Sequence, residues 1–364
     1  MNQPRITGIG KANPPLRLTQ EQSFCATGYE SERIHKIFLN SDIDFRHLYF
    51  EGNLNRNEGS DQLNQRYLRG ALHTGCRAIL DCLKSGNSSA QDVGFLAVCT
   101  CTGYVCPDLS SRLIAHMGSN SSVQRPSIVG LWCAGAAPTL QRATEFDRAN
   151  PGRHALMLPF EICSACYYVD RTLETVIGNA ICADGAAAFV LSGAPGPNRA
   201  YTRITDFEAF IDSKRIDEVG LQQRDGKLRI VLGEAIQRLA GPMIEKGPHP
   251  LFQRHGLSQS QIRFWVVHPG GRKVIDHVQK HFGMNDSQLR FSRSVLRNYG
   301  NMSSPTVMFV LDEIVRSGEP LAGDWGVMIA LGRGMAAELA LLRWYGDPAQ
   351  RHARSTRRAH TKRE

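Results

Sequence analysis

In the first half of the chain, apolar stretches the length of a β-strand alternate with longer segments of helical periodicity. Val93 to Thr100 is almost continuously apolar, as expected for a strand that is buried on both faces. In residues 60–84, apolar side chains recur at the spacing of one helix face, with Ser60 or Asp61 as the cap. The same pattern predicts strands at 4–10, Val129–Cys133, His154–Ile162 and Ala186–Ser192, and helices at Asp108–Met117 and Pro138–Ala149.

The second half repeats this order of elements after the strongest cluster of structure-breaking residues, Pro195-Gly196-Pro197-Asn198. Its pattern predicts a helix within Asp225–Ala240, a strand at Ile262–Val267, helices at Lys273–Phe282 and Ser304–Ser317, and a strand at Trp325–Leu331. Strands that alternate with helices indicate an α/β fold with a buried sheet. We therefore expect two similar halves, residues 1–195 and 196–346, followed by a tail, residues 347–364.

Positive charge is concentrated at the end of the chain. The 364 residues have a formal net charge of +9; residues 351–364 contribute six Lys or Arg and one Glu, a net of +5, which leaves +4 for the other 350. The tail has no hydrophobic periodicity and no Phe, Tyr or Trp to stack on bases, so we expect it to be disordered rather than to bind nucleic acid. The remaining positive charge suits a polyanionic ligand such as a coenzyme A thioester, without requiring one.

The sequence predicts neither a membrane-spanning segment nor a secretion signal. No apolar run approaches the roughly 18 residues of a transmembrane helix. Met1–Ile9 lacks the basic and apolar regions of a signal peptide. We expect a cytoplasmic protein, whose ten cysteines are free thiols rather than a disulfide framework.

One of these thiols, Cys133, stands where a nucleophile is expected. It follows an apolar run and precedes Ala134-Gly135-Ala136-Ala137 and a predicted helix. The positive end of a helix favours a thiolate, and small residues let a substrate carbonyl approach the sulfur. His268 and Asn301, each at a junction of predicted elements in the second half, are candidate partners. Each residue alone is also typical of packing or of a turn, but the three together indicate a site.

These segments resemble those of the thiolase superfamily and, within it, the type III polyketide synthases, the chalcone-synthase-like enzymes. The similar segments occur in the family's order: Gly8 to Pro15, Cys133-Ala134-Gly135, Ala183 to Ala188, His268-Pro269-Gly270-Gly271, Tyr299 to Ser304 and the closing Gly332 to Glu338. The resemblance implies a thiolase-like five-layered αβαβα fold of two similar halves, usually in a homodimer. It places Cys133 in the first half and His268 and Asn301 in the second, and it implies no metal and no cofactor besides the coenzyme A thioester substrates.

The resemblance also implies a reaction, the decarboxylative Claisen condensation of malonyl-CoA onto an acyl-CoA starter or onto another malonyl unit. Cys133 would carry the acyl group as a thioester, and His268 would hold the sulfur as a thiolate through an ion pair. His268 and Asn301 would bind the malonyl thioester oxygen, onto which negative charge moves as CO2 leaves. The product would cyclise to a small resorcinol-type aromatic or a pyrone, with dihydroxyphenylacetyl-CoA among the candidates.

Further positions are assigned by the same resemblance. Phe207 and Phe252 match the family's gate phenylalanines best; Ser303, Cys163, Cys166, Cys182 and Trp132 are expected to border the substrate cavity; and Arg46, Gly270 and Gly271 are candidate contacts to coenzyme A. The chain departs from the family in three places. Trp132 stands where a glycine is more usual, Arg333 stands in the closing loop, and only Arg46 remains where plant members have phosphate-binding lysines.

The sequence leaves three other functions open. A β-ketoacyl-acyl-carrier-protein synthase of fatty-acid initiation uses the same Cys-His-Asn chemistry, but its histidine lies in a different motif from His268-Pro269-Gly270-Gly271. A zinc module built from Cys99, Cys101, Cys106 and His116 lacks zinc-finger spacing. A basic nucleic-acid-binding protein that acts through its tail would lose function if the chain ended at Tyr345, whereas a synthase would keep it.

Overall fold

The computed structural model describes residues 3–50, 58–193, 201–216, 219–224, 226–232, 247–332 and 336–346. Within these ranges the main sheet is mixed and has nine strands, in the order β11-β12-β13-β8-β1-β7-β6-β4-β5. Its strands are β1 (Arg5–Ala12), β4 (Val93–Thr100), β5 (Ser127–Val129), β6 (His154–Ile162), β7 (Asp184–Ser192), β8 (Tyr201–Ile211), β11 (Ile262–Val267), β12 (Trp325–Gly332) and β13 (Ala336–Tyr345). Two small antiparallel sheets pair β2 (Arg17–Thr19) with β3 (Phe45–His47) and β9 (Val219–Arg224) with β10 (Lys227–Leu232).

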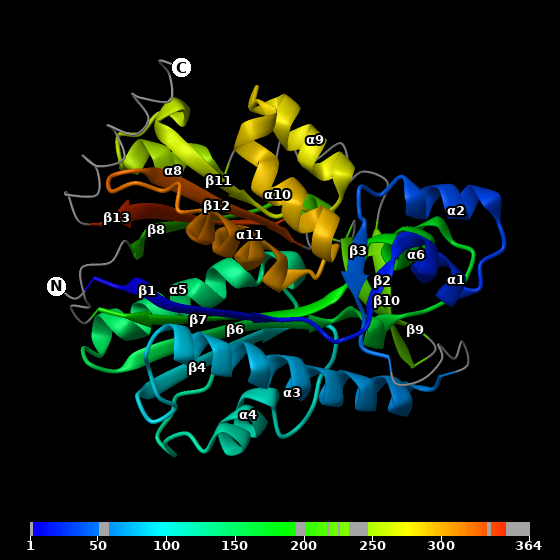
Figure 1. Ribbon diagram of the computed structural model, residues 1–364, viewed down its shortest axis with the longest axis horizontal. Helices are drawn as coiled ribbons and strands as arrows, with labels where there is room; N and C mark the ends of the chain where they lie inside the picture. Colours follow the sequence, from blue (N-terminus) through cyan, green and yellow to red (C-terminus); the bar gives the residue numbers. More distant parts are fainter. Residues whose placement is uncertain are drawn as a thin grey trace, which may run out of the picture.

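Helices separate the two halves of the main sheet and cover their outer faces, which gives five layers (Figure 1). α3 (Ser60–Ser85) and α4 (Leu109–Met117) cover the half that contains β4, β6 and β7. α5 (Ala136–Ala149) and α11 (Ser304–Ser317) form the middle layer and contact strands of both halves. α8 (Pro248–Arg254), α9 (Arg272–His281) and α10 (Asp286–Tyr299) cover the other half. The predicted αβαβα arrangement is therefore confirmed.

The remaining short helices gather at one end of the layers (Figure 1). They are α1 (Gln20–Thr27), α2 (Glu32–Leu39) and α6 (Leu173–Ile181). Four 3₁₀ turns complete the described elements, η1 (Trp132–Ala134), η2 (Cys163–Cys166), η3 (Ser213–Arg215) and η4 (Gln259–Gln261). Two of them, η1 and η2, carry predicted site residues.

The middle layer contains the most deeply buried helix. Five consecutive residues of α11, Val307 to Leu311, are each 0% exposed, so this helix is buried around its whole circumference. Its side chains belong to a hydrophobic cluster that also includes α5 and strands from both halves of the sheet. The two halves meet again where β1 pairs with β8 through Arg5–Arg203 and Ile6–Thr202.

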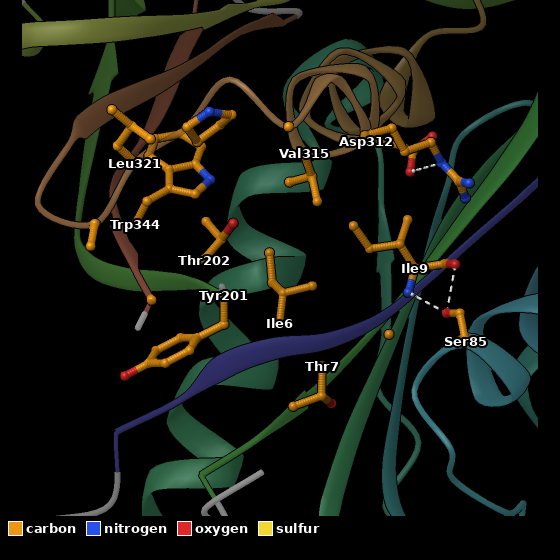
Figure 2. Close-up of a pocket in the computed structure, with 16 residues that line it drawn as sticks. Ile6, Thr7, Ile9, Ser85, Tyr201, Thr202, Asp312, Val315, Leu321 and Trp344 are labelled. Atoms are coloured by element: carbon orange, nitrogen blue, oxygen red, sulfur yellow. Dashed lines mark hydrogen bonds and ion pairs between the residues drawn. The ribbon is translucent and has the colours of Figure 1, made fainter. Parts of the chain in front are cut away.

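A cavity of about 380 Å³ lies at this β1–β8 seam. Figure 2 shows Ile6, Val315 and Leu321 around it, while the Ser85 hydroxyl bonds with the backbone of Ile9 at 2.8 Å. The cavity is lined by the beginning of β1 rather than by the end that leads to Asn13, so it lies apart from the predicted site.

Several predicted elements agree with the structure. Val93–Thr100, His154–Ile162, Ile262–Val267 and Ser304–Ser317 have the predicted bounds. The strand expected to reach Cys133 is wrong, because β5 ends at Val129. Its parallel partner β4 ends at Thr100, the residue paired with Val129, so no strand backbone lies beyond it for β5 to pair with.

Of the range Asp225–Ala240, in which a helix is expected, Lys227–Leu232 forms β10 instead. Residues 233–246 lie outside the described residues, as do the boundary predicted at 195/196, Arg333 of the closing loop and the tail 347–364. In the described ranges, no helix combines the length and the apolar character needed to cross a membrane.

Candidate active site

Cys133 lies in a tight turn between β5 and α5. The turn is η1, and Cys133 within it is 7% exposed. The backbone N–H of Gly135 donates to the carbonyl oxygen of Trp132 at 2.9 Å. Trp132 has a φ of 49°, a left-handed value that is strained for a bulky side chain. Strain of this kind is typical of residues beside a functional group.

Elements from both halves pack closely against this turn. A Cβ atom added to Gly135 would clash, at 2.3 Å, with the sulfur of Cys99 in the first half. A Cβ on Gly332, at the end of β12, would lie 2.4 Å from the Cβ of Ala134. The backbone around Cys133 is therefore fixed by β4 on one side and by β12 on the other.

His268 follows the last residue of β11 and is 1% exposed. Its backbone N–H donates to the carbonyl oxygen of Ile329, on β12, at 2.9 Å. Within the described part of the chain, neither ring nitrogen of His268 has a hydrogen-bond partner. Burial alone lowers the pKa of His268 from 6.5 to about 3, so the ring is neutral near neutral pH. A buried imidazole with both nitrogens unused is available to a thiol or to a substrate oxygen.

Asn301 is held by hydrogen bonds at both ends of its side chain. Its amide nitrogen donates to the carbonyl oxygen of Gly270 at 3.1 Å, and its amide oxygen accepts from the backbone N–H of Ser303 at 2.8 Å. Its backbone bonds to both neighbours of Cys182: its N–H donates to the Ile181 carbonyl at 2.8 Å, and its C=O accepts from Ala183 at 2.9 Å. Among the described residues, Gly270 is the only acceptor of a hydrogen bond from this amide nitrogen, so its second hydrogen is available to another acceptor.

The three predicted residues come from separate segments that converge on β12 and the Gly270 turn. β12 carries both Ile329, which holds the backbone of His268, and Gly332, which presses on the turn of Cys133. Asn301 bonds to Gly270, two residues after His268. A Cβ on Gly270 would lie 3.6 Å from Nε2 of His268, so this glycine lies against the ring. The arrangement provides a thiol, an imidazole and an oriented amide, the groups needed for acyl transfer.

Glu161, a carboxyl group that is 0% exposed near the end of β6, was not among the residues predicted from the sequence. It accepts hydrogen bonds from the backbone N–H groups of Cys101 and Thr102, at 3.0 and 3.1 Å, and from the hydroxyl of Ser304 at 3.2 Å. Burial raises its pKa, and the hydrogen bonds from Cys101 and Thr102 oppose this rise. Glu161 therefore links the chain after β4 to the start of α11, next to Asn301. A single carboxylate in an otherwise apolar strand was the signal that could have revealed it.

The predicted lining residues are buried around this region. Cys163 and Cys166, in η2, are 2% and 3% exposed, and Trp132 is 6% exposed. The Cys166 sulfur donates to the carbonyl oxygen of Thr102 at 3.3 Å. Ser303 has a φ of 61°, and its hydroxyl donates to Glu161 at 3.4 Å. Contact of these side chains with a substrate stays a prediction.

The two candidate gate residues lie in hydrophobic clusters. Phe252, on α8, packs edge-on against Trp265, with ring centroids 6.3 Å apart. Phe207, on β8, is opposite Ala340 of β13 and packs against the central cluster. These surroundings are those of packing aromatic residues, and the gate role stays a prediction.

Arg46 is 0% exposed, which argues against a direct contact with a coenzyme A phosphate at the surface. Its guanidinium donates to the carbonyl oxygen of Cys182 at 2.8 Å and to the hydroxyl of Ser23 at 3.2 Å. Burial lowers its pKa, which the neighbouring hydroxyl of Tyr167 and the sulfur of Cys182 oppose. The structure thus places Arg46 as a support for the segment that holds Asn301.

Gly270 and Gly271 form the turn between His268 and α9, and Gly271 has a φ of 152°. Their contact with coenzyme A stays a prediction.

Among the described residues, no three His, Cys, Asp or Glu side chains are grouped to hold a metal ion, so the zinc alternative gains no support.

Comparison with known proteins adds independent evidence. Residues 54–195 match the family described as chalcone and stilbene synthases, N-terminal domain, and residues 205–345 match the C-terminal domain of the same family. A 3,5-dihydroxyphenylacetyl-CoA synthase of Amycolatopsis balhimycina is 32% identical, with 93% of each chain covered. A 1,3,6,8-tetrahydroxynaphthalene synthase of Streptomyces peucetius subsp. caesius is 28% identical, again with 93% of each chain covered.

Two solved structures share the fold. PKS-I from the brown alga Ectocarpus siliculosus matches with a TM-score of 0.87 and 27% identity, over 94% of this chain and 98% of that one. The bacterial type III polyketide synthase 1,3,6,8-tetrahydroxynaphthalene synthase from Streptomyces coelicolor A3(2) matches with a TM-score of 0.86 and 25% identity, over 94% of this chain and 100% of that one.

The backbone strain at Trp132 predicts an unusual order of stability for two variants. Trp132→Ala removes a buried ring, which costs about 3–5 kcal/mol of the free energy of unfolding, and keeps a side chain in the left-handed region. Trp132→Gly removes the same ring but relieves strain of about 1 kcal/mol. We expect Trp132→Gly to be at least as stable as Trp132→Ala in urea unfolding.

Trp265, on the regular strand β11, is the matched control. There, glycine should be less stable than alanine by roughly 0.5–1 kcal/mol. The same order at both positions would contradict the strain at Trp132.

His268 predicts a loss of stability in acid. Its folded pKa of about 3 lies below the value of 6.5 expected in the unfolded chain. Between these values the unfolded chain binds a proton that the folded chain excludes. This difference in proton binding lowers the free energy of unfolding as the pH falls below about 6.5 and has no effect above it. On moving from about pH 7.5 to about pH 5, His268→Gln should lose about 2 kcal/mol less free energy of unfolding than wild type.

His116→Gln, at an exposed position of α4, is the control for the substitution itself. Equal losses for His268→Gln and wild type would show that His268 is protonated in the folded chain.

Proposed function

We propose that this chain, which belongs to the chalcone and stilbene synthase family, condenses malonyl-CoA onto an acyl group carried by Cys133. The chain is a type III polyketide synthase, an acyltransferase, as the sequence motifs predicted. Members of this family act on coenzyme A thioesters. The observation that carries the proposal is the convergence of Cys133, His268 and Asn301 on β12 and the Gly270 turn.

Loading begins when the thiol of Cys133 passes its proton to His268, and the resulting thiolate attacks the thioester carbonyl of the starter. The C–S bond to coenzyme A then breaks, coenzyme A leaves as a thiol with the proton from His268, and the acyl-enzyme remains. Burial disfavours a charged His268, so the imidazolium needs an anion beside it, which the thiolate supplies. The position of Cys133 before α5 also favours the thiolate, because the N-terminus of a helix attracts negative charge.

Chain extension uses the hydrogen-bond donors of Asn301 and His268. As the malonyl carboxylate leaves as CO2, negative charge develops on the thioester oxygen. The free amide hydrogen of Asn301 and an N–H of His268 stabilise that oxygen in a site from which water is largely excluded. The enolate carbon then attacks the Cys133 thioester; the new carbon–carbon bond forms, the C–S bond to Cys133 breaks, and the thiolate of Cys133 is released while the lengthened chain remains on coenzyme A.

We expect the product to be a small resorcinol-type aromatic. The 3,5-dihydroxyphenylacetyl-CoA synthases of two Amycolatopsis species and of Streptomyces toyocaensis, at 31–32% identity, support a product similar to dihydroxyphenylacetyl-CoA, made from malonyl units. A pyrone is the second candidate. Mass spectrometry of products formed from malonyl-CoA, with and without starter thioesters, distinguishes the two.

A groove of about 720 Å³ between α2 and α6 is our candidate for the entry of coenzyme A. Arg33 and Arg171 line it together with Glu30 and Asp170, and Asp170 forms an ion pair with Arg229. The two arginines offer phosphates the positive charge that the buried Arg46 does not offer at the surface. α6 runs from Leu173 beside the groove to Ile181 beside Cys182. Its nine residues span about 14 Å, so a bound thioester can extend from the groove toward the site.

The catalytic assignment predicts that loading and decarboxylation can be separated. Cys133→Ala should form no acyl-enzyme by intact-protein mass and should not elongate a starter. Asn301→Ala should still load a starter but release CO2 at least roughly 100-fold more slowly, because one donor to the developing oxyanion is lost. Cys25→Ala, which changes an exposed thiol, is the control and should behave as wild type. Elongation by Cys133→Ala would refute the assignment.

The groove predicts a selective effect of charge reversal. Arg33→Glu and Arg171→Glu should each raise the KM for malonyl-CoA several-fold and leave kcat nearly unchanged, because they weaken ground-state binding of the phosphates. With a malonyl thioester of N-acetylcysteamine, which lacks those phosphates, both variants should match wild type. Lys280→Glu, on the exposed face of α9, is the control for net charge. An unchanged KM for malonyl-CoA would exclude the groove as the entry for coenzyme A.

We also propose that the chain is a homodimer. β5 is the last strand at its end of the described sheet, and its Val129 is 56% exposed. An uncovered edge strand with exposed apolar side chains favours pairing with another chain. Sedimentation should give twice the 40.3 kDa chain mass, and Val129→Lys should increase the monomer fraction. A monomeric wild type at micromolar concentration would refute the proposal.

A further inference from the structure

Cys163 and Cys182 face each other where two adjacent strands meet the active site. Ile162 at the end of β6 and Asp184 at the start of β7 are antiparallel partners. Continuing this register by one residue places Cys163 opposite Ala183, beside Cys182. The two cysteine side chains are hydrogen bonded to each other, and they are 2% and 6% exposed. Neither is part of a disulfide bond in the part of the chain that the structure describes.

We propose that Cys163 and Cys182 form a dithiol pair that a hydroperoxide oxidises reversibly to a disulfide, and that the disulfide suppresses condensation. The formation of this bond requires no substrate, so the inference goes beyond the proposed function. Neighbouring thiols are engaged differently: the Cys101 sulfur donates to Glu161 at 3.2 Å and the Cys166 sulfur to the carbonyl oxygen of Thr102 at 3.3 Å.

The surroundings give the two thiols different roles. The hydrogen bond with Cys182, together with burial, raises the pKa of the Cys163 thiol well above its usual value, so Cys163 keeps its proton. Cys182 lies beside the buried guanidinium of Arg46, which donates to its carbonyl oxygen and favours negative charge nearby. Cys182 is therefore the thiol that reacts first, and Cys163 is the resolving thiol.

The oxidation proceeds in two steps. The Cys182 sulfur attacks one oxygen of hydrogen peroxide; an S–O bond forms, the O–O bond breaks, and water leaves with the thiol proton, which gives a sulfenic acid. The Cys163 sulfur then attacks the Cys182 sulfur; the S–S bond forms, the S–O bond breaks, and a second water leaves with the Cys163 proton. Two thiols lose two electrons in total, and one peroxide is reduced to two waters.

The bond would act on catalysis through Asn301. The residues on either side of Cys182 make both backbone hydrogen bonds to Asn301, from Ile181 at 2.8 Å and Ala183 at 2.9 Å. A disulfide would draw Cys182 toward η2, and the bonded segment would carry Asn301 with it. Decarboxylation should therefore decline more than the loading of Cys133.

The test treats the full-length protein with increasing hydrogen peroxide, blocks remaining thiols and maps the peptides. We expect a Cys163–Cys182 linked peptide and a loss of two hydrogen masses, both reversed by dithiothreitol, at peroxide concentrations that leave Cys133 reactive toward iodoacetamide. CO2 release from malonyl-CoA should fall with the linked fraction and return after reduction. Cys163→Ser should form no link and should accumulate a sulfenic acid at Cys182 that dimedone traps.

Two further variants test whether the link is specific to Cys163 and Cys182. Cys25→Ser removes an exposed thiol and should form the link as wild type does. Cys182→Ser should give no dimedone adduct at Cys163. Intact thiols at Cys163 and Cys182 after Cys133 is fully oxidised, or links to other cysteines instead, would overturn the dithiol pair. A link that forms while CO2 release is unchanged would overturn its effect on condensation, whatever the activity of Cys133 variants shows about the proposed function.

Discussion

The buried carboxylate of Glu161 is the constraint on which the active-site geometry depends. A carboxyl group at 0% exposure is costly to bury unless hydrogen-bond donors surround it. Among the described residues, seven hydrogen bonds reach it, from the end of β4 with the two residues that follow it and from the start of α11. Ser303 adopts a strained backbone there, and its N–H orients Asn301. The hydrogen bonding of one buried carboxyl group thus determines where the amide of Asn301 points.

His268 presents the opposite situation in the same site. Its ring is equally buried, yet both nitrogens lack a partner among the described residues. An unsatisfied buried polar group is costly, so its presence is best understood as a function that the substrate and Cys133 complete. The site combines a rigid part, in which several hydrogen bonds hold Glu161 and Asn301, with a reactive part, the ring of His268.

Local patterns were enough to predict the alternation of strands and helices and to single out Cys133, whereas the five layers were implied by the resemblance to a family. The continuous apolar runs of β4 and β11 and the small residues after Cys133 are local features, and they led to the correct strands and to a plausible nucleophile. The end of β5 could not be predicted locally, because it depends on where β4 stops. The burial of Arg46 could not be predicted for a similar reason: a lone arginine suggests a phosphate, but here the fold encloses its side chain beside Cys182.

The burial of α11 on all sides has a consequence for how the chain reaches its native state. The helix lies late in the sequence, yet its contacts include strands formed more than a hundred residues earlier. Neither half alone can shield it from water, so the halves resemble each other without being independent folding units. Most of the loop-closure entropy must be lost before this core forms, which is characteristic of slow folding with high contact order. A ribosome must release nearly the whole chain before the central layer can assemble.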